Sequence, residues 1–351
     1  MLSELSSILL FTLVSFILAL CLYPGYIRLL AKWKMGKTLR ETTATGEKAE
    51  IFTQLHAGKA GTPTMWGGIF LFVLLVMIWV SLLLQKFGWI TYSLWNQQET
   101  YIVLFGFFSM GLIGLVDDIL NIKNVGKVKG LSIRGKMFWL VLFSGFISYW
   151  FYVKLGIDYI NLRPITGQVK IGILFPILTF FGTIAIVNAI NITDGLDGLA
   201  GGLNAGILLM FIIATLLNGT YLTATVLSVM VSVLWAFLFL NVKPAKIFMG
   251  DSGAFALGGL IASTLYLLNM RTGIFIPFLV VFFFFMVELM SSGLQMVWKK
   301  VFKKKLFPIA PFHHYLEYKG IAEYTIVMKV WLVQVVLTLI GVLCLLVQYA
   351  S

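Results

Sequence analysis

Charged residues and cysteines are scarce in this chain of 351 residues. Charged side chains make up 11% of the sequence, against about 25% in a typical soluble domain, and apolar residues make up 60%. Only two cysteines, Cys21 and Cys344, are present, which excludes a disulfide framework and a cysteine–histidine metal site. The composition also excludes a soluble enzyme, a disordered chain and a collagen-like rod. The sequence therefore predicts an all-α polytopic membrane protein.

Long apolar runs fill most of the chain. Each is close to the roughly 20 residues that a helix needs to cross a bilayer, and the alternating pattern of a membrane β-barrel is absent. We expect a single membrane domain, residues 1–351, with about ten transmembrane helices. The predicted spans are roughly 6–30, 66–85, 102–116, 137–153, 171–189, 199–217, 221–240, 254–270, 274–297 and 325–349.

Lysine and arginine are divided unevenly between the two sets of loops. Of the 26 basic residues, 21 lie in or beside the loops that follow odd-numbered spans, and five lie on the other side. Loops rich in lysine and arginine stay in the cytoplasm. We therefore expect both termini outside the cell and five loops inside it. The net charge of +12 reflects this topology, and no nucleic acid is expected as a partner.

Acidic residues number only 14, and several of them gather at one boundary. Aspartates from three distant segments fall at the expected cytoplasmic ends of spans, namely Asp117, Asp118, Asp194, Asp197 and Asp251. Any one of them can be a helix cap. However, two adjacent carboxylates at a helix C-terminus oppose the helix dipole, so Asp117 and Asp118 need a cation. Mg²⁺ is a natural choice because it binds carboxylates together with phosphate oxygens.

One acid, Glu288, lies inside the predicted ninth span. It either pairs with a neighbouring helix or supports an active site, and ionisable groups at such depth are functional hypotheses by default.

Two segments rich in glycine and polar side chains accompany the aspartates. In the segment 188–202, Asn188 and Asn191 share a helix face, and Asp194 and Asp197 repeat their spacing. In the segment 241–253, an exposed Phe248 is expected before a Gly-Asp-Ser-Gly turn at a helix N-terminus. Such a turn suits phosphate, and an aromatic ring suits a base. An interfacial turn with a capping aspartate is the alternative.

Two cytoplasmic loops carry further candidates. The loop before the second span combines Lys59 and Thr64 with glycines, a composition suited to phosphate. The last loop places His313 and His314 after a run of lysines. The histidines are either surface residues or phosphate ligands, and the lysines either anchor the loop to anionic lipid or help to bind phosphate.

Together these motifs resemble the polyprenyl-phosphate N-acetylhexosamine-1-phosphate transferase superfamily. The resemblance runs from Lys59 to Glu317, and its motifs are GTPTM, Asp117-Asp118, NITDGLDGLAGG, FMGDSG and APFHH. The APFHH loop is similar to that of members acting in peptidoglycan synthesis. This implies transfer of phospho-N-acetylmuramoyl-pentapeptide from its UDP conjugate to undecaprenyl phosphate in the bacterial plasma membrane, giving lipid I and UMP. A sister N-acetylglucosamine-1-phosphate transferase is the alternative, and a transporter or flippase is the alternative outside this class.

The resemblance also implies Mg²⁺ as cofactor, a homodimer, and roles for particular residues. Asp251 would bind the metal and Asp117 would be the acid or base, with Asp118, Lys136 and Asp194 as further catalytic residues. The residues expected to hold the nucleotide sugar are Lys59, Thr64, Asn188, Asn191, Gly195, Leu196, Asp197, Asn241 and Phe248, with His313 and His314 closing over the substrate.

Three positions depart from the family pattern. Asn121 stands where a lysine is frequent, so a phosphate contact there is expected from Lys123 or Lys136. Tyr315 replaces the third of three consecutive histidines. Trp66 is inserted before the two glycines that open the second span, so a displaced start of that span is expected.

Overall fold

The computed structural model describes residues 2–36, 59, 61–96, 98–122 and 130–350, and it is almost entirely helical. The long helices are α1 (Leu2–Lys32), α3 (Trp66–Lys86), α4 (Gln98–Ile122), α5 (Ile133–Tyr149), α6 (Leu174–Thr193), α7 (Leu199–Leu217), α8 (Tyr221–Asn241), α9 (Gly250–Asn269), α11 (Phe283–Phe302) and α13 (Glu323–Ala350). The shorter elements are the π-helical turn η2 (Trp150–Lys154), α10 (Phe275–Val281), α12 (Phe312–Tyr318) and the antiparallel strands β1 (Tyr159–Asn161) and β2 (Gln168–Lys170).

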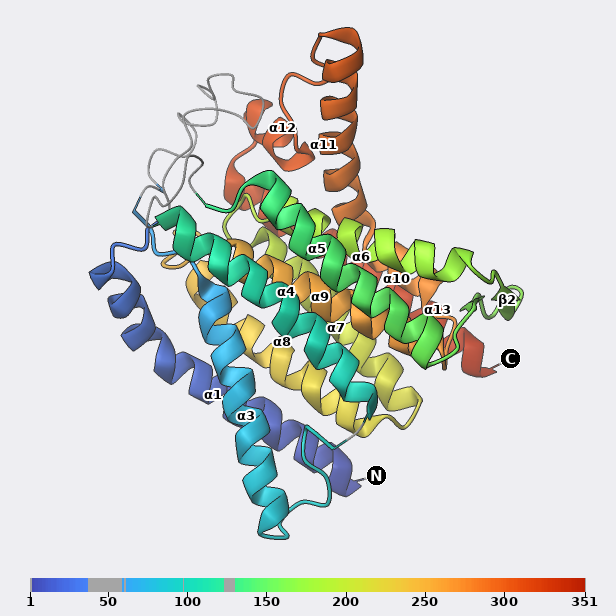
Figure 1. Ribbon diagram of the computed structural model, residues 1–351. Coiled ribbons are helices and arrows are strands. Elements are labelled where there is room, and N and C mark those ends of the chain that lie inside the picture. The colour runs from blue at the N-terminus through green and yellow to red at the C-terminus, as the bar shows by residue number, and fades with distance from the viewer. Residues whose placement is uncertain (1, 37–58, 60, 97, 123–129, 351) are drawn as a thin grey trace.

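The helices follow the predicted spans, with one difference. Within the described residues, nine helices are long and apolar enough to cross a membrane, and α10 with α11 would make a tenth. The prediction of one continuous ninth span over 274–297 is wrong, because α10 and α11 meet at a bend of 68°. Beyond the bend, α11 leaves the bundle (Figure 1). There Gln295 accepts hydrogen bonds from the backbone of Leu306 and Phe307, so the loop before α12 packs on α11.

Trp66, the inserted residue, is the first residue of α3. Met65 before it has a left-handed backbone with φ of 83°. The Trp66 ring is fully buried and stacks on Phe70 and on Phe237 of α8, each at 4.4 Å between ring centroids. The insertion therefore becomes a packing contact between α3 and α8.

Helix α9 forms the centre of the bundle, against α3, α4 and α6 (Figure 1). Its residues from Ser252 to Asn269 are all buried. Glycines allow the close packing: a Cβ on Gly259 would lie 2.0 Å from the carbonyl oxygen of Gly106 in α4, and a Cβ on Gly114 would lie 2.2 Å from that of Asp251. Backbone-to-backbone contact through small residues is the usual way in which membrane helices approach one another. It brings Asp117 of α4 next to the first turn of α9.

We expect Gly114→Ala to destabilise the protein. The added methyl group would meet backbone atoms, so α4 and α9 would have to separate, at a cost of about 1–3 kcal/mol. The melting temperature in detergent should fall by several degrees. Gly25→Ala in α1 is the matched control, because a Cβ there has no neighbour within 4 Å. Equal melting temperatures for the two variants would contradict the packing argument.

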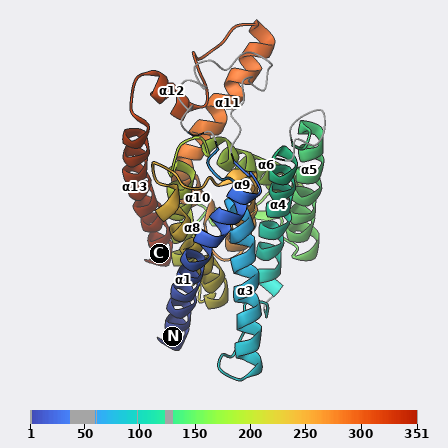
Figure 2. The ribbon, with the colours of Figure 1, turned by 90° about the vertical axis from the view of Figure 1, so that its left-hand side faces the viewer.

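The two ends of the bundle differ. Both termini lie at one end, and α12 lies at the other (Figures 1 and 2). The β1–β2 hairpin is fixed to the C-terminus of α9, since Asn269 accepts from the backbone of Asn161 and donates to that of Tyr159. The N-terminus of α9, with Asp251, points towards the end where α12 lies.

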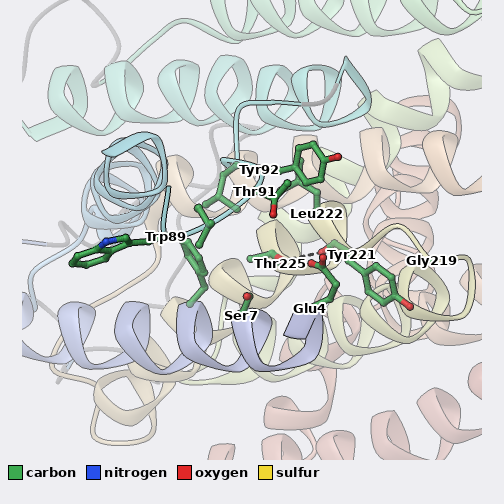
Figure 3. A pocket seen from close by; sticks show the side chains of 12 residues that line it. Glu4, Ser7, Trp89, Thr91, Tyr92, Gly219, Tyr221, Leu222 and Thr225 are labelled. Atoms are coloured by element: carbon green, nitrogen blue, oxygen red, sulfur yellow. Dashed lines mark hydrogen bonds between the residues drawn. The ribbon is translucent and has the colours of Figure 1, made fainter. Parts of the chain in front are cut away.

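A hollow of about 280 Å³ opens between the first turns of α1, the loop after α3 and the start of α8. Figure 3 shows Glu4, Tyr92 and Tyr221 around it. Glu4 is the one charged residue among the described side chains that line it. With a carboxylate and without a lysine or arginine, this hollow does not suit an anionic nucleotide, and the candidate site must be sought at the other end.

Candidate active site

Three carboxylates and one lysine meet between α4, α5 and α9, and we call them the aspartate cluster: Asp117, Asp118, Asp251 and Lys136. The carboxylates offer oxygen atoms within 4.8 Å of one another. Lys136 Nζ lies 2.7 Å from Asp117 Oδ2 and 2.6 Å from Asp251 Oδ2. Three carboxylates and one ammonium leave two net negative charges when all are ionised. The cluster therefore has the charge and the hard oxygen donors that suit a divalent cation.

Asp118 is occupied by the N-terminus of α9. Its Oδ1 accepts the backbone N–H of Asp251 at 3.1 Å, and its Oδ2 accepts that of Ser252 at 3.0 Å. These are first-turn N–H groups that have no partner within their own helix. Gly250 permits this approach, since its φ is +71° and a Cβ there would lie 2.6 Å from Asp118 Oδ2. Asp118 therefore aligns Asp251 by holding its backbone.

Lys136 enters the cluster from the first turn of α5. Ser132 caps this helix by accepting the N–H of Gly135 at 3.1 Å, which fixes where the helix begins. Asp117 also accepts the backbone N–H of Leu131 at 2.7 Å, so the segment before α5 is tied to α4. Of the two lysines expected to replace the missing one at Asn121, Lys136 lies in the cluster, and Lys123 lies outside the described residues.

Four charged residues form a second group, which we call the lysine–glutamate cluster: Lys59, Asp197, Lys243 and Glu323. Lys59 Nζ lies 2.7 Å from Asp197 Oδ1 and also bonds to Glu323 Oε1, while Lys243 Nζ lies 2.6 Å from Glu323 Oε2. The hydrogen bond to Glu323 raises the pKa of Lys243. This group joins the segment before α3, the α6–α7 turn, the α8–α9 loop and the start of α13.

Asn241 joins two of the same segments. Its Oδ1 accepts the N–H of Gly198 at 2.9 Å, and its Nδ2 donates to the carbonyl of Ile247 at 2.8 Å. Asp197 adds a further link, because its Oδ2 accepts the N–H of Ala245 at 3.1 Å. Asn241 and Asp197, both predicted to hold the nucleotide sugar, therefore shape the α6–α7 turn and the α8–α9 loop.

Phe248 differs from expectation. The sequence predicts an exposed ring, but Phe248 is only 7% exposed. Its backbone explains this: its N–H donates to Pro63 at 2.8 Å and its carbonyl accepts the N–H of Trp66 at 3.2 Å, which covers it with the segment before α3. Thr64 lies in that segment, and its Oγ1 would be 3.0 Å from a Cβ on Gly250. Thr64 is thus brought to the start of α9, beside the aspartate cluster.

The two histidines are buried and held by two glutamates. His313 Nδ1 lies 2.9 Å from Glu288 Oε2, and its backbone N–H donates to Glu288 Oε1 at 3.0 Å. His314 Nδ1 lies 2.7 Å from Glu317 Oε2. The first of the two alternatives for the histidines, surface residues, is therefore wrong. Glu288 pairs with the neighbouring helix α12, which is one of the two predictions made for it. Tyr315, in place of a third histidine, lies with its ring centroid 5.5 Å from Lys319 Nζ.

Stability should depend on His314 at acid pH. Burial lowers the pKa of His314 from 6.5 to about 4. Between these values the unfolded chain binds a proton that the folded protein does not, so the free energy of unfolding falls as the pH drops. We expect His314→Gln to lose less melting temperature than the wild type between about pH 7.5 and about pH 5. Parallel pH profiles for the two proteins would contradict the lowered pKa.

Gly195 connects the histidines to the α6–α7 turn. A Cβ on this residue would lie 2.2 Å from His313 Nε2, so the turn and the imidazole are in direct contact. Leu196 beside it is buried. Asp194 is the C-cap residue of α6 and is not one of the three clustered aspartates. Asn188 and Asn191 are half-buried in the last turns of α6, and Asn188 donates to the carbonyl of Ile184 at 2.7 Å.

The sequence does not point to three of the residues in these contacts. Glu323 and Glu317 fall among the loop acids, and Lys243 is one of many lysines in the loops that the sequence predicts to be cytoplasmic. In the structure Glu323 lies in the first turn of α13, where a negative charge is favourable. Nothing local predicts its lysine partners, because they lie at positions 59 and 243.

Comparisons with known proteins agree with the site. The glycosyl transferase family 4 model matches residues 100–269, which include both Asp117 and Asp251. The chain is 33% identical over 330 residues to a phospho-N-acetylmuramoyl-pentapeptide-transferase of Clostridium perfringens, covering 93% of this chain and 94% of that one. Proteins of the same name from Clostridium botulinum, at 34% identity over 95% of each chain, and Staphylococcus carnosus, at 30% identity over 94% and 96%, are similar. The chain therefore belongs to the phospho-N-acetylmuramoyl-pentapeptide transferase family.

Proposed function

We propose that this enzyme transfers phospho-N-acetylmuramoyl-pentapeptide from its UDP conjugate to undecaprenyl phosphate, forming lipid I and UMP for peptidoglycan synthesis. The observation that carries the proposal is the aspartate cluster, in which Asp117, Asp251 and Lys136 come together from three helices. Similarity to transferases of this name over almost the whole chain supports the choice of substrate over N-acetylglucosamine-1-phosphate.

Mg²⁺ is the proposed cofactor. Asp251, with Asp117 and Asp118 beside it, would hold the ion, since each of the three offers a carboxylate oxygen to the cluster. When bound, the ion supplies charge stabilisation to the diphosphate and to the leaving UMP oxygen. With all four groups ionised, the cluster carries two net negative charges, which match one divalent cation and support the fit.

In the proposed reaction, an oxygen of the lipid phosphate forms a bond to the β-phosphorus of the nucleotide. The bond from that phosphorus to the UMP oxygen breaks, and UMP leaves. Catalysis of such a transfer is mainly positioning and charge stabilisation. Lys136, between Asp117 and Asp251, is well placed to contact a phosphate oxygen. The remaining predicted site residues would bind the nucleotide sugar, and the His313–His314 pair would cover it.

Asp117 has three candidate roles: a base, an orienting group or a covalent nucleophile. The second pKa of a phosphate monoester is near 6, so most lipid phosphate needs no deprotonation at neutral pH. We therefore favour an orienting role and direct, one-step attack. Labelled UMP, incubated with enzyme and nucleotide sugar but without lipid phosphate, should not enter the nucleotide sugar. Exchange in lipid-free preparations would establish a covalent intermediate instead.

The proposal places the site at the cytoplasmic face of the bacterial plasma membrane, in a single domain with both termini outside. The lysines of the α11–α12 loop lie at the same end as His313, which supports this orientation. The Lys246→Cys variant, in a background without Cys21 and Cys344, should react with an impermeant maleimide only in inverted vesicles. Cross-linking in intact membranes would test the expected homodimer.

The deciding assay measures UMP release by the purified enzyme with each donor, with and without Mg²⁺. We expect release with the UDP-N-acetylmuramoyl-pentapeptide and undecaprenyl phosphate, and loss of release on chelation. Turnover with UDP-N-acetylglucosamine but not with the muramoyl donor would reverse the assignment to the sister transferase. Metal-independent turnover would remove the proposed role of the cluster.

A further inference from the structure

Glu323 connects three segments that the proposed function assigns to donor binding. Its Oε1 bonds to Lys59 and accepts the backbone N–H of Asp197 at 2.8 Å, and its Oε2 lies 2.6 Å from Lys243 Nζ. The residue is only 6% exposed. Charge-assisted hydrogen bonds of this kind are stronger and more directional than neutral ones. Glu323 therefore determines the orientation of its partners and also neutralises positive charge on the two lysines.

Lys59 is the partner with a proposed function. Its ammonium lies between Asp197 and Glu323, and the side chain is 11% exposed. The first carboxylate belongs to the α6–α7 turn and the second to α13, so the two together determine where Lys59 points. A lysine has four rotatable bonds and presents a point charge, so its reach depends on such anchors.

Lys243 makes the lysine–glutamate cluster electrically neutral. Two lysines and two carboxylates carry no net charge, and Lys243 is the most exposed of them, at 45% of its side chain. Without Lys243, the two carboxylates would outnumber the one remaining lysine next to the site of an anionic donor. Lys243 contacts Glu323, so its effect on Lys59 passes through that carboxylate.

We infer that Glu323 is a positioning residue of the nucleotide-sugar site, which directs Lys59 towards the anionic donor, and that Lys243 supports it as a counter-ion. This inference rests on the proposed function. Glu323 also links the donor-binding loops to α12, the helix that carries His313 and His314. The link is short, because α13 begins at Glu323, five residues after the end of α12.

Whether Glu323→Gln tightens or weakens donor binding distinguishes a positioning role of Glu323 from a purely electrostatic one. If Glu323 acted only through its negative charge, Glu323→Gln would add one positive charge and tighten binding of an anionic donor. In a positioning role, glutamine keeps a single, neutral oxygen and turns its amide N–H₂ group against one of the two lysines, so the ion pair that anchors Lys59 is reduced at best to a neutral hydrogen bond. Donor binding then weakens although the site becomes more positive.

The experiment compares Glu323→Gln with wild type in the UMP-release assay with saturating undecaprenyl phosphate. We expect KM for UDP-N-acetylmuramoyl-pentapeptide to rise about 10-fold while kcat changes by less than about 3-fold, because the lost contact acts on binding. Melting temperature in detergent is recorded for each variant, since a merely structural staple would lower stability and leave KM unchanged.

Variants at Lys243 complete the test. Lys243→Gln should raise KM less than Glu323→Gln does, Lys243→Arg should restore it, and the double variant should be no worse than Glu323→Gln alone. Lys246→Gln removes an exposed lysine from the same loop and is the matched control, with an expected KM equal to that of wild type.

Failure of this inference and failure of the proposed function give different results. A wild-type enzyme that releases no UMP from this donor contradicts the proposed function, and the inference falls with it. A wild-type enzyme that turns over normally while Glu323→Gln has an unchanged or lower KM contradicts the inference alone. A loss confined to kcat or to the melting temperature also overturns it.

Discussion

Replacing Asp251 by asparagine should lower the rate of UMP release by about 1,000-fold or more, while the protein still folds. The Asp251→Asn substitution would keep the size of the side chain and its place in the first turn of α9, but it would remove the charge that Lys136 contacts at 2.6 Å. The cluster would lose a carboxylate from its proposed Mg²⁺ site, so charge stabilisation at the diphosphate would weaken. The measurement is kcat at saturating donor over a range of Mg²⁺ concentrations.

Asp158→Asn is the control for this loss of charge. Asp158 lies beside the β1–β2 hairpin at the opposite end of the bundle, where it pairs with exposed Lys170 at 3.0 Å. A surface ion pair of this kind contributes little, so rate and melting temperature should stay near wild type. Activity of Asp251→Asn within about 10-fold of wild type would exclude the aspartate cluster as the reaction centre.

Gly195→Ala should reduce kcat/KM by about 100-fold or more, because it displaces His313. The new methyl group would lie 2.2 Å from His313 Nε2. The imidazole cannot move away easily, because Glu288 holds both the ring Nδ1 and the backbone N–H of His313. The side chains of both residues are fully buried. Gly195 does not have a positive φ, so alanine adds a steric conflict without backbone strain.

Gly293→Ala in α11 is the matched control, because a Cβ there has no neighbour within 4 Å. It should keep wild-type kinetics. His313→Gln in the Gly195→Ala background should add little further loss if the alanine acts through the imidazole. Full additivity of the two substitutions would show that Gly195 and His313 act independently.

The helices were largely predictable because their signal is local. An apolar run of about 20 residues is sufficient to identify a spanning helix, and α7 begins and ends where the sequence predicts, at Leu199 and Leu217. The sequence does not predict the break in the ninth span, because apolar composition does not reveal the bend at Phe282. That bend accompanies contacts of α11 with the loop before α12, which the composition does not record.

The candidate site was predictable in its membership more than in its contacts. Motif and spacing predict Asp117, Asp251 and the histidines as site residues, whereas Phe248, which the sequence predicts to be exposed, is buried. Asp118, which the motif predicts to act beside Asp117, also accepts two backbone N–H groups at the start of α9, a contact that the sequence does not predict. Such roles depend on which backbone groups a side chain reaches after folding.

By itself, the sequence determined a helical membrane protein, the set of loops in which its lysines gather, and the segments that we propose carry its chemistry. These follow from the length of apolar runs and from charges counted along the chain, and both are local quantities. Only the tertiary structure decided that Lys59 meets Glu323, that Gly195 touches His313, and that Lys136 lies between two aspartates. These contacts join residues that are as many as 264 positions apart, and helix packing alone brings them together.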